Sequence, residues 1–157
     1  MLYIKEPNGH YRIADEDDVI DEANTIYDRY FSRGEQIKSP EKAQNYLRVK
    51  LAAFDHEVFI GLFLNNQQQV ISCDELAHGT INCASIYPRE VVKTALQHNA
   101  AKVIFAHNHP SGISEPSQAD VHITNKLKDA LSLFDIGVLD HLVIGEGIYS
   151  FAENGRI

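Results

Sequence analysis

The part of the chain that most constrains the fold is residues 102–134, where an apolar run, a polar turn and a helical pattern follow one another directly. Residues 102–106 read Lys-Val-Ile-Phe-Ala, and β-branched and aromatic residues in so short a run predict a buried strand. Prolines, serines and a glycine follow, as in a turn. Pro116 fits the first turn of a helix, because apolar side chains then recur at helical spacing, at Ile123, Leu127, Leu131 and Phe134.

Two histidines and an aspartate lie in or beside that turn. His107 and His109 are two apart at the carboxyl end of the predicted strand, so their side chains point the same way. Asp120 lies in the opening turns of the helix, three positions after Ser117 and on the same side. Two imidazoles and a carboxylate are an ordinary ligand set for catalytic zinc. Because the loop is long enough to fold back, we expect the three side chains to converge about 2 Å from one point, with Ser117 beside it.

Each of these residues also has an ordinary structural interpretation. Two histidines in a loop are often solvated surface groups. Ser117 can hydrogen-bond the backbone at the start of its helix, and Asp120 can interact favourably with the positive end of the helix dipole. Their combination with the strand-to-helix placement favours a metal site.

The same residues form a motif with a known counterpart. His107-x-His109, Ser117 and Asp120, with a glutamate about fifty residues upstream, resemble the JAMM motif of MPN-type zinc metalloproteases. His-Asn-His-Pro-Ser-Gly resembles the bacterial RadC-like branch of that family, as do Gly79-Thr80, Pro88-Arg89-Glu90 and residues 140–144. The resemblance runs from about Ser39 to the C-terminus. It implies an α/β fold with a mixed β-sheet covered by helices, in the three-layer, cytidine-deaminase-like MPN architecture.

The resemblance also implies roles for individual residues. His107, His109 and Asp120 would hold one Zn2+ per chain, Glu57 would be the general acid/base, and Ser117 would help to stabilise the oxyanion. Zinc lowers the pKa of its bound water to about 7, so a nearby carboxylate can take a proton and return it to a leaving amine. The implied activity is that of a zinc metallopeptidase or isopeptidase, which hydrolyses an amide bond of a peptide or protein substrate with a zinc-activated water.

The choice of Glu57 as the general acid/base rests on its place in the sequence relative to the histidines. It begins the apolar segment 57–64, which is typical of a buried strand, and a glutamate at a strand entrance is commonly just exposed to solvent. Glu75 and Glu90 also precede the histidines, but Glu90 follows Pro88 at an expected helix start, where acids are favoured. The distance to the motif favours Glu57.

The other histidines are expected to have no ligand role; they are His10, His56, His78, His98 and His122. His141 follows Asp140 at the opening of an apolar strand. It is interpreted as a hydrogen-bonded structural residue, with support of a metal ligand as the alternative. A fourth protein ligand would close the site and indicate structural zinc.

The rest of the chain predicts a mixed sheet covered by helices, because helical and strand patterns alternate. Residues 1–38 are expected to form an N-terminal helical extension, and residues 39–157 the metallohydrolase domain. Helices are expected at about 15–33, at 39–54 with a cap at Ser39-Pro40-Glu41, and at 88–98 and 116–134. Further strands are expected at 69–76, 138–144 and 148–152, with turns at 65–68 and 145–147.

Charge and cysteine content limit the class of protein. The formal net charge is -8, the isoelectric point is near 5.4, and no Lys or Arg occurs between Lys50 and Arg89. Nucleic-acid binding is therefore not indicated. Longer RadC-like proteins carry an N-terminal helix-hairpin-helix module, and this chain shows no match to one. Cys73 and Cys83, without a signal peptide or a membrane-spanning run, favour a reduced cytoplasmic protein with no disulfide.

The sequence leaves three other interpretations to compare. HNH nucleases share the letters His-Asn-His, but their motif residues are not consecutive. Zinc deaminases carry His-x-Glu and Pro-Cys-x-x-Cys, which this chain lacks. A noncatalytic MPN scaffold, with a link to DNA repair through the RadC name, is the third. Scaffolds typically lose the ligands, and here the full set is present.

Overall fold

The computed structural model describes residues 1–30, 32–79 and 85–157. Its centre is a five-stranded sheet with the strand order β4-β3-β5-β6-β7. The strands are β3 (Val58–Leu64), β4 (Val70–His78), β5 (Lys102–Asn108), β6 (Gly137–Ile144) and β7 (Ile148–Ser150). Only β5 and β6 pair in parallel, and the other neighbours are antiparallel. The predicted mixed sheet is confirmed.

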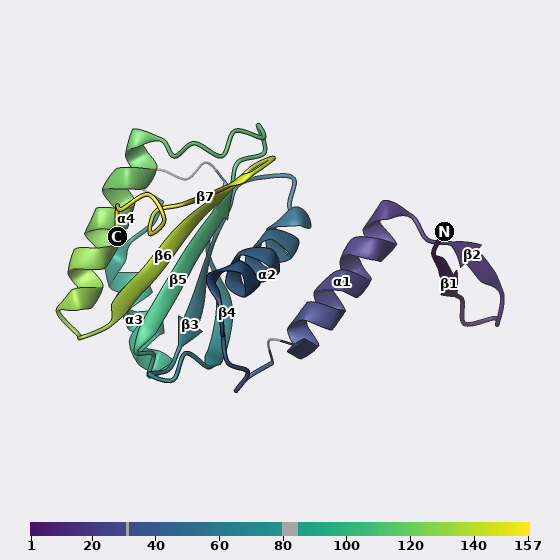
Figure 1. Cartoon of the computed structure of the whole chain (residues 1–157), viewed down its shortest axis with the longest axis horizontal. Coiled ribbons are helices and arrows are strands. Elements are labelled where there is room, and N and C mark those ends of the chain that lie inside the picture. Colours follow the sequence, from purple (N-terminus) through teal and green to yellow (C-terminus); the bar gives the residue numbers. More distant parts are fainter. Residues whose placement is uncertain (31, 80–84) are drawn as a thin grey trace.

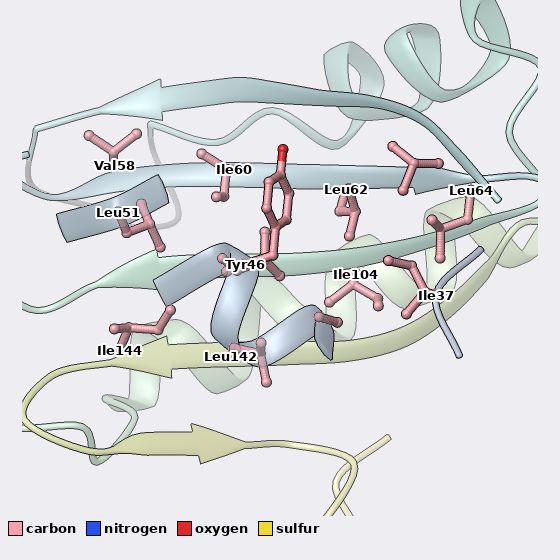
Figure 2. Packing of buried hydrophobic residues seen from close by; sticks show 14 residues of the cluster. Ile37, Tyr46, Leu51, Val58, Ile60, Leu62, Leu64, Ile104, Leu142 and Ile144 are labelled. Carbon is pink, nitrogen blue, oxygen red and sulfur yellow. The ribbon is translucent and has the colours of Figure 1, made fainter. Parts of the chain in front are cut away.

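Helices cover both faces of this sheet, which produces three layers (Figure 1). Helix α2 (Pro40–Ala52) packs on one face, and its apolar side chains lie over the strands (Figure 2). Helices α3 (Pro88–Gln97) and α4 (Gln118–Ser132) pack on the other. Helix α2 begins as predicted: the Ser39 hydroxyl accepts a hydrogen bond from the backbone N–H of Lys42, and Pro40 opens the first turn.

Alternation along the strands decides which side chains meet which helix layer. In β3, Ile60 and Leu62 belong to the cluster under α2, whereas Phe59 and Phe63 belong to the cluster under α3 and α4. In β5, Val103 and Phe105 face the second cluster. Because successive side chains alternate between faces, position 107 continues this row toward α4.

The N-terminal segment contains a hairpin that the sequence pattern does not predict. Strands β1 (Tyr3–Lys5) and β2 (Tyr11–Ile13) form it, and α1 (Glu16–Tyr30) follows. Its three-residue strands are mostly exposed and too short for an alternating pattern to identify them, although Asn8-Gly9, with Gly9 at φ 87°, is a hairpin-turn signal. Figure 1 shows the hairpin away from the sheet. Helix α1 is joined to α2 through Asp28, which is 2.8 Å from the Lys50 Nζ.

Several predicted boundaries differ from the structure by about two residues, for example the strand expected to end at 106, which ends at Asn108. Two of the differences have local reasons. The helix expected from 116 begins at Gln118, because Ser117 is its N-cap and Pro116 precedes the cap. The strand expected to reach 152 ends at Ser150, because the Asp140 carboxylate accepts hydrogen bonds from the Ser150 hydroxyl and the Ala152 backbone N–H, which turn the chain. None of the described helices is long and apolar enough to cross a membrane.

The cysteine prediction is tested only in part. Cys73 in β4 is a free thiol. Burial raises the pKa of this thiol to about 11. The expectation that Cys83 forms no disulfide concerns a position outside the described residues, as does the Thr80 of the resemblance.

Candidate metal centre

His107 reaches the centre because of the alternation of β5. It is fully buried next to the end of that strand, on the face that packs against α4. The ring of Phe59, its partner on β3, stacks beside it with 6.1 Å between ring centroids. His107 is therefore held by the core on one side and presents its Nε2 atom to the loop and helix that follow.

His109 is the first residue of the loop after β5, and hydrogen bonds hold both its backbone and its ring. Its backbone N–H donates to the carbonyl of Ile144 at 2.8 Å, and its Nδ1 lies 2.7 Å from the carbonyl oxygen of Ile113. Because a carbonyl only accepts, Nδ1 carries the proton and Nε2 is left with a lone pair. The His109 ring therefore has the tautomer that a metal ligand at Nε2 requires.

The loop that carries His109 is docked on the turn between β6 and β7. The Glu146 backbone N–H donates to the Gly112 carbonyl at 2.8 Å. At Gly145, a Cβ would lie 2.3 Å from the same carbonyl oxygen, so only glycine fits this approach. Gly112 has a φ of 85°, a backbone conformation that glycine adopts readily. The turn predicted at 145–147 thus also positions a candidate ligand.

Asp120 comes from the buried stripe of α4. Asp120, Thr124, Leu127 and Leu131 recur on the side of α4 that faces the sheet. The Ser117 hydroxyl accepts from the Asp120 backbone N–H at 3.1 Å and donates to its Oδ2 at 2.8 Å, and the Ser117 backbone N–H donates to Oδ2 at 2.7 Å. This capping box fixes the carboxylate at the start of the helix.

The three predicted ligands converge. The Nε2 atoms of His107 and His109 are 3.0 Å apart. Asp120 Oδ1 lies 3.2 Å from the Nε2 of His107, and Asp120 Oδ2 lies 3.5 Å from the Nε2 of His109. Ligand atoms of a tetrahedral zinc site are about 3.3 Å apart, given metal–ligand bonds of about 2.0–2.1 Å. The donor set and its spacing therefore fit zinc. The structure contains a buried His-His-Asp group that could hold a metal ion.

The electrostatics of the group favour a cation. Burial alone would raise the pKa of Asp120, but the interaction with His107 and the hydrogen bonds from Ser117 outweigh it and hold that pKa well below its usual value. The Asp120 side chain is 3% exposed, whereas the His109 side chain is 15% exposed. Ligand access to the group is therefore from the His109 side.

His141 contacts the group from β6 and is not a fourth ligand. Its Nε2 lies 2.8 Å from the Nδ1 of His107, on the side of that ring opposite the convergence point. Its Nδ1 lies 2.6 Å from the Thr124 hydroxyl. Burial lowers the pKa of His141 well below its usual value. The prediction of a hydrogen-bonded structural residue is thus supported by its contacts, and its partner is a predicted ligand.

Glu57 is placed at the same end of the sheet. It directly precedes β3 and is half-buried. The register of β3 with β5 ends at the pair of Phe59 and His107, and Glu57 lies two residues beyond Phe59, at the end of the sheet that carries His107. The carboxamide of Asn108 holds the backbone on both sides of it: Oδ1 accepts from the Val58 N–H, and Nδ2 donates to the His56 carbonyl, each at 2.8 Å.

Sequence reasoning therefore missed three contributors to this centre: Asn108, Thr124 and Gly145. Asn108 lies between the two histidines, and its amide groups had no partner that the sequence alone identifies. Thr124 is a polar residue in the apolar stripe of α4, four positions after Asp120, and this spacing is the signal that could have found it. Gly145 was identified only as a turn residue.

The histidines with no predicted ligand role lie outside the His-His-Asp group, which is formed among the described residues by His107, His109 and Asp120. Two of them are joined on the surface: the His56 Nε2 is 3.0 Å from the His78 Nδ1. His78 also contacts Glu75, and His98 contacts Asp74. Glu90, the other acid considered, pairs with Arg89 at the start of α3.

Comparison with known proteins agrees with this geometry. Residues 37–156 match the family described as the RadC-like JAB domain. A UPF0758 protein of Vibrio cholerae is 57% identical over 137 residues, which cover 87% of this chain and 87% of that protein. A UPF0758 protein of Marinobacter nauticus is 53% identical over 134 residues, 85% of this chain and 60% of that protein. A third, of Cellvibrio japonicus, is 58% identical over 123 residues, and the match spans 55% of its length.

Proposed function

Because this chain belongs to the RadC-like JAB domain family, we propose that it is a zinc-dependent peptidase or isopeptidase that hydrolyses an amide bond of a peptide or protein substrate. The observation that carries the proposal is the convergence of one ligand atom each from His107, His109 and Asp120 within 4.8 Å of one another. Three protein ligands leave a fourth position open, which distinguishes a catalytic site from a structural one.

The three ligands supply the binding site of one zinc ion. His107 and His109 each offer Nε2, and Asp120 offers a carboxylate oxygen. When bound, zinc would lower the pKa of a water to about 7 and polarise the scissile carbonyl. The buried faces of His107 and Asp120 exclude water from behind, so a substrate would approach past the partly exposed His109.

Glu57 is proposed as the group that moves the proton. It would take a proton from the attacking water and deliver it to the leaving amine. Its support is its position two residues before Phe59, the strand partner of His107, and the Asn108 carboxamide, which holds the backbone at Val58 and His56. A third bond, from the Gly79 N–H to the Glu57 carbonyl at 2.8 Å, ties the residue to the end of β4.

Ser117 is proposed to stabilise the oxyanion, and the structure adds a condition to that role. Its hydroxyl donates to Asp120 Oδ2 at 2.8 Å. Donation to a substrate oxygen would require the hydroxyl to turn away from Asp120, which would keep its bond to the Ser117 backbone N–H. Ser117 thus combines orientation of a ligand with a donor group beside the site.

The test begins with the zinc content of the purified protein. We expect about one zinc per chain, lost in His107→Ala and Asp120→Ala and retained in His122→Ala, a variant of an exposed histidine on the same helix as Asp120. Screening of peptide and isopeptide substrates would follow, with Glu57→Gln expected to keep zinc and lose hydrolysis. A folded protein that takes up no zinc after reconstitution would refute the proposal and favour a scaffold role.

A further inference from the structure

Behind the proposed metal site, three buried groups form a continuous chain of hydrogen bonds. The Nδ1 of His107 is 2.8 Å from the Nε2 of His141, and the Nδ1 of His141 is 2.6 Å from the Thr124 hydroxyl. That hydroxyl is in turn 2.6 Å from the backbone carbonyl oxygen of Asp120. His107 and His141 are fully buried and Thr124 is 1% exposed, so water does not compete for these contacts.

The carbonyl at the end of the chain determines the direction of every bond. A carbonyl oxygen only accepts, so the single hydroxyl proton of Thr124 is donated to Asp120. The Thr124 oxygen must then accept from His141, whose Nδ1 carries a proton. A hydroxyl donating to His141 instead would leave two oxygens facing each other at 2.6 Å without a proton between them.

Aromatic side chains enclose the imidazole of His141. Its ring is stacked on Phe151, with 4.9 Å between centroids, and meets the edges of Phe59 and Phe105. No described carboxylate hydrogen-bonds to the ring to stabilise an imidazolium. A neutral His141 with a proton on Nδ1 has a lone pair on Nε2, and this atom accepts from His107 Nδ1.

We propose that His141 and Thr124 are positioning residues that hold His107 in the tautomer with its proton on Nδ1 and its Nε2 lone pair directed at the metal position. The proposal rests on the metal site proposed above and explains how it is set. His109 is set in the same tautomer by the carbonyl of Ile113. Both imidazoles thus derive their orientation from a backbone carbonyl, His109 directly and His107 through two side chains.

The His141 position can be tested with two variants. His141→Leu fills the space but removes the acceptor for His107. His141→Gln places a carboxamide oxygen near the former Nε2 position, where it can still accept from His107. Loss of such a partner typically lowers metal affinity 10- to 100-fold. We expect a loss of that size, about 10- to 100-fold, in His141→Leu and a smaller loss in His141→Gln.

The Thr124 position has a closer matched pair. Thr124→Val keeps the shape and removes the hydroxyl, whereas Thr124→Ser keeps the hydroxyl. Because Thr124 acts on the metal ligand through His141, we expect zinc affinity to fall about tenfold or less in the valine variant and to stay near wild type in the serine variant. A merely space-filling role for Thr124 would produce the opposite order, with serine the more harmful substitution.

Two measurements decide the proposal. Zinc affinity is measured by competition with a chromogenic chelator on the full chain, after thermal unfolding has shown that each variant folds. The tautomers are read from 15N–1H couplings of the imidazoles, with and without zinc. We expect His141 protonated on Nδ1 in both states, and His107 protonated on Nδ1 alone when zinc is bound.

Each outcome bears on one claim. A proton on Nε2 of His141, or wild-type zinc affinity in both His141→Leu and Thr124→Val, overturns the proposal that His141 and Thr124 position His107. If His141→Leu does not fold, the Thr124 pair decides. If the wild-type protein binds no zinc, the proposed function fails, and the His141 tautomer in the metal-free protein still tests the chain of hydrogen bonds.

Discussion

Replacement of Asn108 by alanine tests whether the residue between the two histidines organises the segment that carries Glu57. Its side chain is 7% exposed and bridges two backbone groups, the Val58 N–H and the His56 carbonyl. Alanine removes both bonds and leaves these groups without their partner. The ligand atoms of the candidate metal site are untouched, because both side-chain hydrogen bonds of Asn108 go to backbone groups and neither goes to a histidine Nε2 atom.

The expected loss of stability follows from the two bonds. Each is 2.8 Å long, and a buried hydrogen bond contributes a net of about 0.5–1.5 kcal/mol to the free energy of unfolding. Val58 is completely buried, so its N–H cannot find water and adds a desolvation cost of about 1–3 kcal/mol. We therefore expect a total loss of about 2–6 kcal/mol, which for a chain of this length corresponds to a melting temperature lower by roughly 4–24 °C.

Urea unfolding of Asn108→Ala beside the wild type measures this loss, and Asn66→Ala, in the exposed turn between β3 and β4, is the matched control. The control should change the free energy of unfolding by no more than about 0.5 kcal/mol. Zinc content should stay at the wild-type level in both variants, while hydrolysis falls in Asn108→Ala alone. A loss below about 0.5 kcal/mol at Asn108 would refute the bridging role.

Three further outcomes are expected. Gly145→Ala should lower zinc affinity because its Cβ would lie 2.3 Å from the Gly112 carbonyl oxygen, whereas Gly147→Ala, whose Cβ meets nothing closer than 3.6 Å, should bind zinc normally in the same chelator assay. Burial raises the pKa of Asp140, so the folded protein loses stability as pH rises above the unfolded pKa of about 4 and this carboxyl ionises. Urea titrations should therefore show Asp140→Asn becoming more stable relative to wild type over that rise in pH, and a difference in stability that does not change with pH would contradict this. Cys73, with its pKa raised to about 11, should resist alkylation at pH 8 in the folded protein and react in urea, as peptide mass spectrometry would show.

Much of the candidate site could be predicted from local sequence because its residues obey local rules. The side chains of positions 103, 105 and 107 share one face of a strand, so His107 had to point with Val103 and Phe105. The capping pair Ser117 and Asp120 is likewise a local arrangement, three residues apart at a helix start. The roles of Glu57 and Ser117 in catalysis stay predictions.

The N-terminal hairpin was not predicted for the opposite reason. Strands of three residues with exposed side chains contain too few positions for an alternating pattern. The division into residues 1–38 and 39–157 also stays a prediction, although the family match begins close to its boundary, at residue 37.

The sequence by itself determined the candidate ligand set, the strand that presents the histidines and the helix that presents Asp120, since spacing within a strand or helix dictates direction. Only the tertiary structure decided which side chains support the candidate ligands and the segment that carries Glu57. His107 meets His141 across 34 positions of sequence, His141 meets Thr124 across 17, and Asn108 meets Val58 across 50. These contacts depend on the parallel register of β5 with β6, on the antiparallel register of β5 with β3 and on the packing of α4 over the sheet, and no local periodicity specifies them.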